Sequence, residues 1–352
     1  MSRETAQAVI VTARNELGIR ELPCPEPGPY EAVVRVLACG ICSGTDTSIV
    51  GGSFPSLPPY PFVLGHEGIG EVVSCGSRAR NLKPGDLVLR PSLLRPGESI
   101  EGVESAFGGM ATWGLVADAK AIEEDTTPGE EPALPVFAPT QQVVPAGFDP
   151  HHSGIFITFK ETLGALLDLV AAPNPSVLIL GAGVVGLCFT RAARLIGCSQ
   201  VVTLARRAEP LQTAMALGAD AVIDTSTEDA AARTNELTGG KGFDYVVEAV
   251  GSNELINLAL DLVAIGGSVG LYGVIGEGVI KLDWARGGRN WSIKYLNTRE
   301  AEVHEATLSY WQHGLAGIEG LVTHRMPFVE IDQALELIRS RKGYKISLDF
   351  SG

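Results

Sequence analysis

Residues 176–198, SVLILGAGVVGLCFTRAARLIGC, decide the fold of this chain. An apolar run comes first, three glycines follow in the spacing GxGxxG, and the segment ends as a helix with one apolar face. Gly181 permits a tight turn, Gly183 lets the backbone approach a pyrophosphate, and Gly186 lets the helix pack closely on the strand. The stretch therefore predicts the strand–turn–helix unit that binds a dinucleotide.

Apolar strands alternate with helical segments beyond this stretch, among them VVTLA, FDYVVEAVG and GSVGLYG. This alternation predicts a doubly wound α/β domain with a parallel sheet, the Rossmann arrangement. Val184 and Val185 would then offer backbone N–H groups to phosphates at a helix N-terminus. Val250 and Gly251 follow a later strand, and we expect their backbone to line the nicotinamide half of the site.

The strand after the glycines ends in Ala205-Arg206-Arg207. Proteins selective for NAD carry an acidic residue near this point, which binds the ribose 2′-hydroxyl. A carboxylate would repel a 2′-phosphate, whereas the guanidinium groups of Arg206 and Arg207 can bind one by charge-assisted hydrogen bonds. An ordinary solvated arginine pair is the alternative, and the sequence favours NADP over NAD.

The chain of 352 residues is long enough for two domains, and its composition excludes several classes of protein. A hydrophobic content of 45% argues against disorder, and a net charge of −14 without a basic cluster argues against nucleic-acid binding. The first residues lack a basic region followed by an apolar core, so we expect no signal peptide, and no uninterrupted apolar span reaches bilayer length. We therefore expect a cytoplasmic protein without nucleic-acid or membrane partners, in which six scattered cysteines form no disulfide framework.

The segments before the glycine motif have another character. Residues 7–117 read as short β segments separated by turns, and residues 119–142 are acidic, rich in proline and without periodicity. We expect the former to form a β-rich domain and the latter to be a surface loop or insertion.

A second motif lies in the β-rich part, where Gly65, His66, Glu67, Gly70 and Gly76 follow the pattern G-H-E-x2-G-x5-G. Together with the upstream Gly-Ile-Cys at 40–42, it resembles the zinc-dependent medium-chain dehydrogenases, the family of alcohol, sorbitol and threonine dehydrogenases. The resemblance covers essentially the whole chain. It implies a GroES-like catalytic domain from residues 1–157 and 298–352, and a Rossmann domain from 158–297.

The resemblance also implies a catalytic zinc. Cys42 and His66 match the first two ligands of the family, and Glu161 stands where sorbitol-type members carry a glutamate. Glu67 matches the carboxylate beside the ligand histidine, and the sequence leaves open whether Glu67 or Glu161 binds zinc at rest. Three protein ligands are typical of catalytic zinc, since the fourth position is kept for water or substrate.

Other positions depart from the family pattern or match it only as single residues. The run from Cys42 to Asp46 is one residue longer than usual, and Thr45 is expected to supply the hydroxyl that passes the substrate proton. Lys345 matches a basic residue near the cofactor phosphates in relatives. Trp113 falls near the substrate in relatives, and could be a pocket wall or a core residue.

Residues 88–142 contain no cysteine, so the second, structural zinc of many relatives is missing, and one zinc per subunit is expected. The resemblance implies hydride transfer between NADP(H) and a secondary alcohol or ketone, with a polyol, sugar or cyclitol as the first substrate class. A simple alcohol or aldehyde reductase is one alternative, and a zinc-free NADPH-binding protein without catalysis is another. A homodimer or homotetramer is expected from the family.

Overall fold

The computed structural model describes residues 5–274, 278–288 and 290–352. The chain divides into two compact units, the first formed by Met1–Ile157 with Leu321–Gly352 and the second by Thr158–Gly320. The first division lies where the sequence places it. The second lies at residue 321, whereas the sequence analysis expects a boundary at residue 298.

Residues 298–320 belong to the second unit because their contacts lie there. The buried ammonium of Lys160 lies 3.4 Å from the carboxylate of Glu300. Further along, Nε of Arg191 donates a hydrogen bond to the carbonyl of Ala316 at 3.0 Å. These are long-range contacts, which a composition change along the sequence does not reveal.

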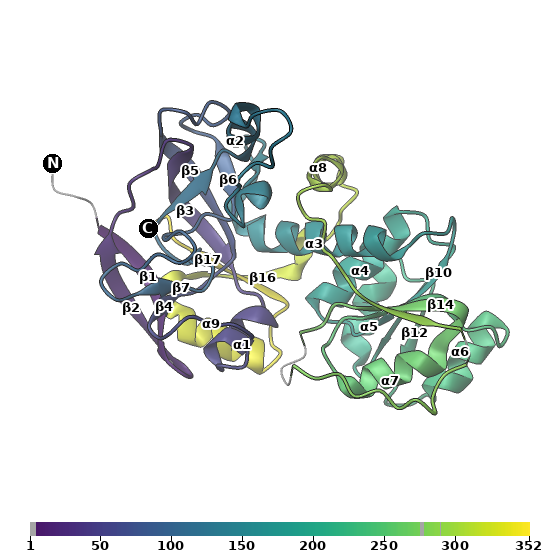
Figure 1. Cartoon of the computed structure of the whole chain (residues 1–352). Helices are drawn as coiled ribbons and strands as arrows, with labels where there is room; N and C mark the ends of the chain where they lie inside the picture. The colour runs from purple at the N-terminus through teal and green to yellow at the C-terminus, as the bar shows by residue number, and fades with distance from the viewer. Residues whose placement is uncertain (1–4, 275–277, 289) are drawn as a thin grey trace. The chain divides into compact units, whose positions relative to one another are not determined.

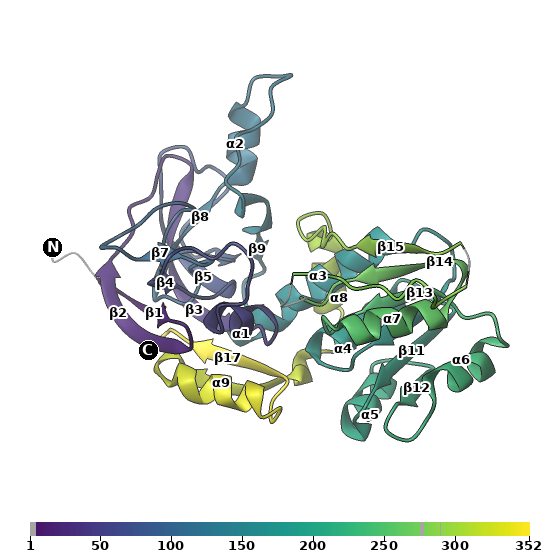
Figure 2. The same cartoon turned by 60° about the horizontal axis from the view of Figure 1, so that its bottom comes forward.

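The second unit, drawn in teal to yellow-green in Figure 1, is built on a six-stranded parallel sheet of order β12-β11-β10-β13-β14-β15. The chain runs from β10 outward through β11 and β12, then returns to the other side of β10 with β13, so the strand order reverses between β10 and β13. Helix α4 packs on β10 and β11, and α7 packs on β13 and β14 (Figure 2). The confirmed architecture is the doubly wound α/β sheet that the sequence predicts.

The strands of this unit are β10 (Ser176–Leu180), β11 (Gln200–Ala205), β12 (Ala221–Asp224), β13 (Phe243–Glu248), β14 (Val263–Leu271) and β15 (Ser292–Tyr295). Its helices are α4 (Val184–Leu195), α5 (Ala208–Ala216), α6 (Ala230–Thr238), α7 (Asn253–Leu262) and α8 (His304–Gln312), with the turn η3 (Glu319–Leu321) at its end. Helix α3 (Ser153–Leu169) begins in the first unit and continues in the second.

The turn from β10 to α4 requires glycine at two positions. Gly181 has a φ of +112°, a conformation that residues with a Cβ rarely adopt. A Cβ on Gly186 would collide with the carbonyl oxygen of Gly181, because the helix starts directly against the turn. The GxGxxG spacing thus reflects the close packing of the strand and helix.

The first unit contains two sheets, as expected for a β-rich domain. One has four strands in the order β2-β1-β4-β7, and the other has seven, with the path β16-β17-β3-β5-β6-β9 and β8 paired with β3. Strands β3 and β17 come from opposite ends of the chain and pair antiparallel. Helix α9 contributes four of its buried residues to the core beside them.

The strands of the first unit are β1 (Thr5–Ala13), β2 (Glu16–Pro23), β3 (Glu31–Gly40), β4 (Phe62–Val63), β5 (Glu67–Cys75), β6 (Leu87–Leu89), β7 (Glu104–Ser105), β8 (Trp113–Ala117), β9 (Val143–Val144), β16 (Val322–Pro327) and β17 (Lys345–Asp349). The helices are α1 (Thr45–Val50), α2 (Ala119–Asp125) and α9 (Ile331–Arg339), with short turns η1 (Ala138–Thr140), η2 (Pro150–His152) and η4 (Phe328–Glu330).

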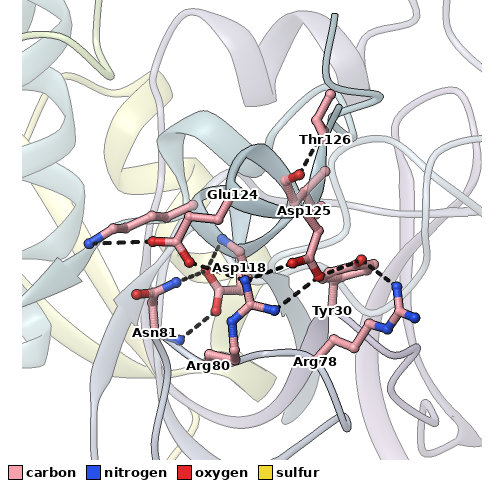
Figure 3. A network of polar contacts seen from close by, with 11 residues as sticks. Tyr30, Arg78, Arg80, Asn81, Asp118, Glu124, Asp125 and Thr126 are labelled. Carbon is pink, nitrogen blue, oxygen red and sulfur yellow. Dashed lines mark hydrogen bonds and ion pairs between the residues drawn. The ribbon is translucent and has the colours of Figure 1, made fainter. Parts of the chain in front are cut away.

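The segment 119–142, expected as a loop, begins with a helix. Asp118 caps α2 by accepting a hydrogen bond from Ala121 at 2.9 Å, and Asn81 donates to the same carboxylate at 2.6 Å. At the other end of α2, the guanidinium of Arg80 bonds Asp125 at 2.9 and 3.0 Å (Figure 3). These bonds connect α2 to the turn after β5, and explain how a segment without apolar periodicity is held in place.

All six cysteines are free thiols. None of the helices in the described ranges is long and apolar enough to cross a membrane.

The buried pair Lys160–Glu300 gives a test of stability. Replacing Glu300 with Gln removes the negative charge that lies 3.4 Å from the ammonium of Lys160, whose side chain is 0% exposed. We expect a loss of about 3 kcal/mol in unfolding free energy, because removing one partner of a buried pair leaves an uncompensated charge. Urea unfolding followed by tryptophan fluorescence measures it.

The matched control is Glu236→Gln, which removes one partner of a pair in the same unit whose side chains are 36% and 66% exposed. That change is expected to cost less than about 1 kcal/mol, as solvent screens exposed pairs. Equal losses in the two variants would contradict a structural role for the buried pair.

Candidate functional site

Three candidate ligands meet in the first unit. The Cys42 thiol, the His66 imidazole and the Glu67 carboxylate offer ligand atoms that all lie within 4.8 Å of one another. The pairing of β3 with β5 brings them together, since Gly40 lies opposite Glu67 in the antiparallel register. Cys42 therefore follows the end of one strand, and His66 directly precedes the start of its neighbour.

A buried carboxylate orients both Cys42 and His66. Oδ2 of Asp46, which is 0% exposed, accepts a hydrogen bond from the Cys42 amide at 2.8 Å. Its Oδ1 lies 3.3 Å from Nδ1 of His66. A carboxylate behind a ligand histidine fixes the ring and raises its basicity, as is typical of zinc sites.

The extra residue between Cys42 and Asp46 is accommodated by a helical turn. The amide of Asp46 donates to the Cys42 carbonyl at 3.0 Å, and α1 begins at Thr45. The acid of the family pattern is thus retained at Asp46. Thr45 lies at the start of α1, three residues beyond Cys42, half-buried.

The electrostatics of this cluster favour a cation. Burial lowers the pKa of His66, but the carboxylate of Asp46 and the thiol of Cys42 outweigh burial and raise this pKa well above its ordinary value. The same negative groups would stabilise a divalent metal ion. Thiol, imidazole and carboxylate are also the donors that zinc prefers, so the residues present fit the metal that the sequence motif implies.

Glu67 has a second partner that the sequence did not indicate. Both of its carboxylate oxygens lie 2.7 Å from Nζ of Lys345, and both side chains are buried. The sequence placed Lys345 beside the cofactor phosphates, but here its ammonium is 4% exposed and bound to Glu67. The physical reason is that a carboxylate buried between β3 and β5 needs a counter-charge, and β17 supplies it.

Glu161 belongs to the second unit, on α3. The hydroxyl of Tyr272, just past the end of β14, donates a hydrogen bond to Oε2 of Glu161 at 3.2 Å. The ring of Tyr272 is itself packed edge-on against Phe189 of α4. The position of Glu161 is thus fixed by the dinucleotide-binding unit, and its role as a ligand stays a prediction.

One phenylalanine ring packs beside His66, and two more pack against that phenylalanine. Phe107 lies 5.1 Å from the imidazole between ring centroids, and Phe54 and Phe137 lie 6.1 and 5.5 Å from Phe107. The sequence missed all three. Trp113, the aromatic candidate that the sequence named, is half-buried and packs against the apolar cluster that includes residues of β1 and β4.

The predicted cofactor residues of the second unit lie at one edge of the sheet. Gly181 and Gly183 follow β10, Arg206 and Arg207 follow β11, and Val250 and Gly251 come two and three residues after β13. Because β11, β10 and β13 are adjacent and parallel, their carboxyl ends share that edge. Val184 and Val185 open α4 there, at the point of strand reversal where ligands bind in such folds.

Two details of this edge concern charge. Arg207 is the N-terminal cap of α5, and the Arg206 side chain is 77% exposed, with a carboxylate, Glu254, no nearer than 3.9 Å. Their guanidinium groups are therefore accessible beside the end of β11. An ordinary solvated pair of arginines would be equally exposed. The expected preference for NADP therefore rests on the position of Arg206 and Arg207 at the end of β11.

The loop after β13 is held by a buried carboxylate. Glu248 accepts hydrogen bonds from the amides of Val250 at 3.0 Å and Gly251 at 2.9 Å. Burial raises the pKa of Glu248, while these backbone donors oppose that shift. Glu248 thus holds the backbone that the sequence expects to line the nicotinamide site.

Comparison with known proteins agrees with both units. The family model described as an alcohol dehydrogenase GroES-like domain matches residues 28–127, and that described as a zinc-binding dehydrogenase matches residues 184–306. Together they cover more than half of the chain. The chain belongs to the zinc-dependent medium-chain dehydrogenases, oxidoreductases that use zinc and a nicotinamide cofactor on alcohols.

Individual relatives are distant but extensive. The L-threonine 3-dehydrogenase of Anaeromyxobacter dehalogenans is 28% identical over 97% of this chain and 98% of its own. The NADP-dependent isopropanol dehydrogenase of Thermoanaerobacter brockii is 28% identical over 79% of this chain and 80% of its own. A solved zinc-binding dehydrogenase of Sinorhizobium meliloti 1021, bound to NADP, is 26% identical, covers 98% of this chain and 99% of its own, and has a TM-score of 0.77.

The role of Asp46 is open to measurement. Asp46→Asn keeps the hydrogen bond to the Cys42 amide, but removes the negative charge from behind His66. We expect zinc affinity to fall about 10- to 100-fold, the usual effect of changing a residue that supports a ligand. Competition with a chromophoric chelator measures the affinity directly.

Asp332→Asn serves as the control, because Asp332 is an exposed acid in the first turn of α9 and lies outside the ligand cluster. Its zinc affinity should match the unaltered protein. Retention of full affinity in Asp46→Asn, with an unchanged melting temperature, would refute the role assigned to this carboxylate.

Proposed function

We propose that this chain is a zinc-dependent secondary-alcohol dehydrogenase that prefers NADP(H), interconverting an alcohol and its ketone. The observation that carries the proposal is the pairing of Cys42 and His66 with the buried acid Asp46 behind them. This arrangement combines two ligands for a catalytic metal with the carboxylate that orients them. A protein that kept this fold without the zinc chemistry would have no functional need for the buried carboxylate of Asp46.

Cys42 and His66 would hold the metal, with Glu67 or Glu161 as the third ligand. When bound, zinc supplies a Lewis acid that lowers the pKa of the alcohol. Lys345 neutralises much of the charge of Glu67, which favours Glu161 as the ligand at rest. Asp46 fixes the His66 ring, and the Thr45 hydroxyl would accept the substrate proton at Oγ1 and pass it toward solvent.

Cofactor preference is proposed from the end of β11. Arg206 and Arg207 would bind a 2′-phosphate, while Gly181, Gly183, Gly186 and the amides of Val184 and Val185 would receive the pyrophosphate. The isopropanol dehydrogenase relative that is named as NADP-dependent agrees with this preference. Val250 and Gly251 would border the nicotinamide, which would supply or accept the hydride when bound.

Substrate class has two candidates. The resemblance to sorbitol-type enzymes favours a polyol, sugar or cyclitol, and a simple secondary alcohol is the alternative. One zinc per subunit and a dimeric or tetrameric assembly complete the proposal, and metal analysis with light scattering checks both.

The metal assignment is tested by Cys42→Ala. Removing the thiolate takes away one of the few protein ligands of a catalytic zinc, so we expect bound zinc and turnover to be lost together. Elemental analysis measures the bound zinc, and assays with NADP over a panel of alcohols measure turnover. Cys75→Ala, which alters a half-buried thiol at the end of β5, is the control and should retain zinc. Undiminished turnover in Cys42→Ala would contradict the assignment of Cys42 as a ligand of a catalytic zinc, and absence of turnover and of zinc in the unaltered protein would favour the zinc-free alternative.

The cofactor assignment is tested by the double variant Arg206→Ala/Arg207→Ala. Loss of two charge-assisted contacts should lower kcat/KM for NADP at least about 100-fold and leave kcat/KM for NAD nearly unchanged, since each such bond contributes at least about 1.5 kcal/mol. Lys241→Ala, an exposed cation elsewhere in the same unit, is the control. A wild-type enzyme that prefers NAD would overturn the assignment.

A further inference from the structure

Three half-buried phenylalanines from separate parts of the first unit form a cluster beside His66. Phe107 lies against the imidazole, with centroids 5.1 Å apart and ring planes tilted by 47°. Phe54 meets Phe107 edge-on, and Phe137 approaches it with a tilt of 49°. We call Phe54, Phe107 and Phe137 the phenyl cluster. Its location beside a candidate metal ligand makes it a candidate wall for substrate.

The position of Phe107 is enforced by its backbone. Phe107 has a φ of +72°, which is rare for a bulky residue and costly unless the surroundings impose it. The following residues impose it here, because the amide of Gly109 bonds the Gly65 carbonyl at 2.7 Å, and that of Met110 bonds the Leu64 carbonyl at 2.8 Å. The strained turn is thus tied to the two residues that lead into His66. Strain of this kind is retained where a side chain must be held in one place.

Phe137 is brought to the cluster by the segment 119–142. The side chain of Gln141, four residues later, accepts from the Ala117 amide at 2.7 Å and donates to the Arg90 carbonyl at 3.0 Å. The guanidinium of Arg90 in turn donates to the His66 carbonyl at 2.6 Å. The acidic segment is therefore bonded back to the residue that carries the imidazole. Its far end is anchored independently through Arg80 (Figure 3).

The chemistry of this wall bears on the substrate. Phenyl rings offer no hydrogen-bond partner, so each hydroxyl of a polyol placed against them would give up water without replacement. An aryl or branched alkyl group would instead gain by leaving water and by ring contact. The structure thus weighs against the polyol that the sequence resemblance favours.

We propose that the phenyl cluster determines specificity, and that the substrate is a secondary alcohol, or its ketone, bearing an aromatic or branched aliphatic substituent. The inference rests on the proposed function and names the substrate class of that site. Phe107 supplies the fixed part of the wall. Phe137 supplies the part that depends on the segment 119–142.

The test uses the zinc-loaded enzyme with NADP and three probes: 1-phenylethanol, 2-propanol and sorbitol. The unaltered enzyme should prefer 1-phenylethanol to sorbitol. In Phe137→Ala and in Phe107→Ala, the ratio of kcat/KM for 1-phenylethanol over 2-propanol should fall about tenfold, equivalent to about 1.4 kcal/mol. Val136→Ala is the matched control, because the Val136 side chain is next in sequence and 75% exposed. That variant should keep the ratio and all variants should keep their zinc.

A second readout does not require turnover. Saturation-transfer NMR with acetophenone reports ring contact, and the aromatic signal should weaken in Phe137→Ala but persist in Val136→Ala. Preference for sorbitol, or an unchanged ratio and signal in both phenylalanine variants, would overturn the inference. If instead no alcohol is oxidised with either cofactor, the proposed function fails, and the acetophenone signal still tests the cluster separately.

Discussion

A buried ion pair between Lys345 and Glu67 joins two parts of the chain that are 278 residues apart in the sequence. Lys345 is the first residue of β17, and Glu67 directly follows the candidate ligand His66. The last strand of the chain therefore contacts the candidate metal site of the first unit. All of the second unit lies between them in the sequence. Burial of either charge without the other would carry a large desolvation free energy. The position of each side chain therefore constrains the position of the other. The alignment of β17, β3 and β5, and with it the approach of Cys42 to His66, depends on that condition.

Much of the fold could be predicted because its signals are local. The apolar run before Gly181, the GxGxxG spacing and the alternation of strands and helices each occupy a short stretch of sequence. Cys42 and His66 could be predicted for the same reason, since each lies in a short motif. The grouping of residues 298–320 with the second unit could not be predicted, because these residues contact Lys160 and Arg191, and composition carries no trace of those contacts.

The missed site residues share a physical cause. Phe54, Phe107 and Phe137 lie near one another only after the chain has folded, and a positive φ at a phenylalanine contradicts its local preference. The partner of Lys345 is likewise set by burial rather than by sequence neighbours. The helix at 119–125 was hidden because polar bonds from Arg80 and Asn81, not an apolar face, hold it. Local rules fail here where tertiary contacts override them.

The segment 119–142 is attached by polar bonds at both ends, to the turn after β5 through Arg80 and to Arg90 through Gln141. The candidate metal ligands, by contrast, belong to strands β3 and β5 and the turns beside them. The segment that contributes Phe137 therefore supplies none of the three candidate ligands of the first unit. Evolution could exchange this segment, and with it selectivity, while the inherited reaction chemistry stays intact. A chain of this architecture is thus a favourable starting point for new substrates.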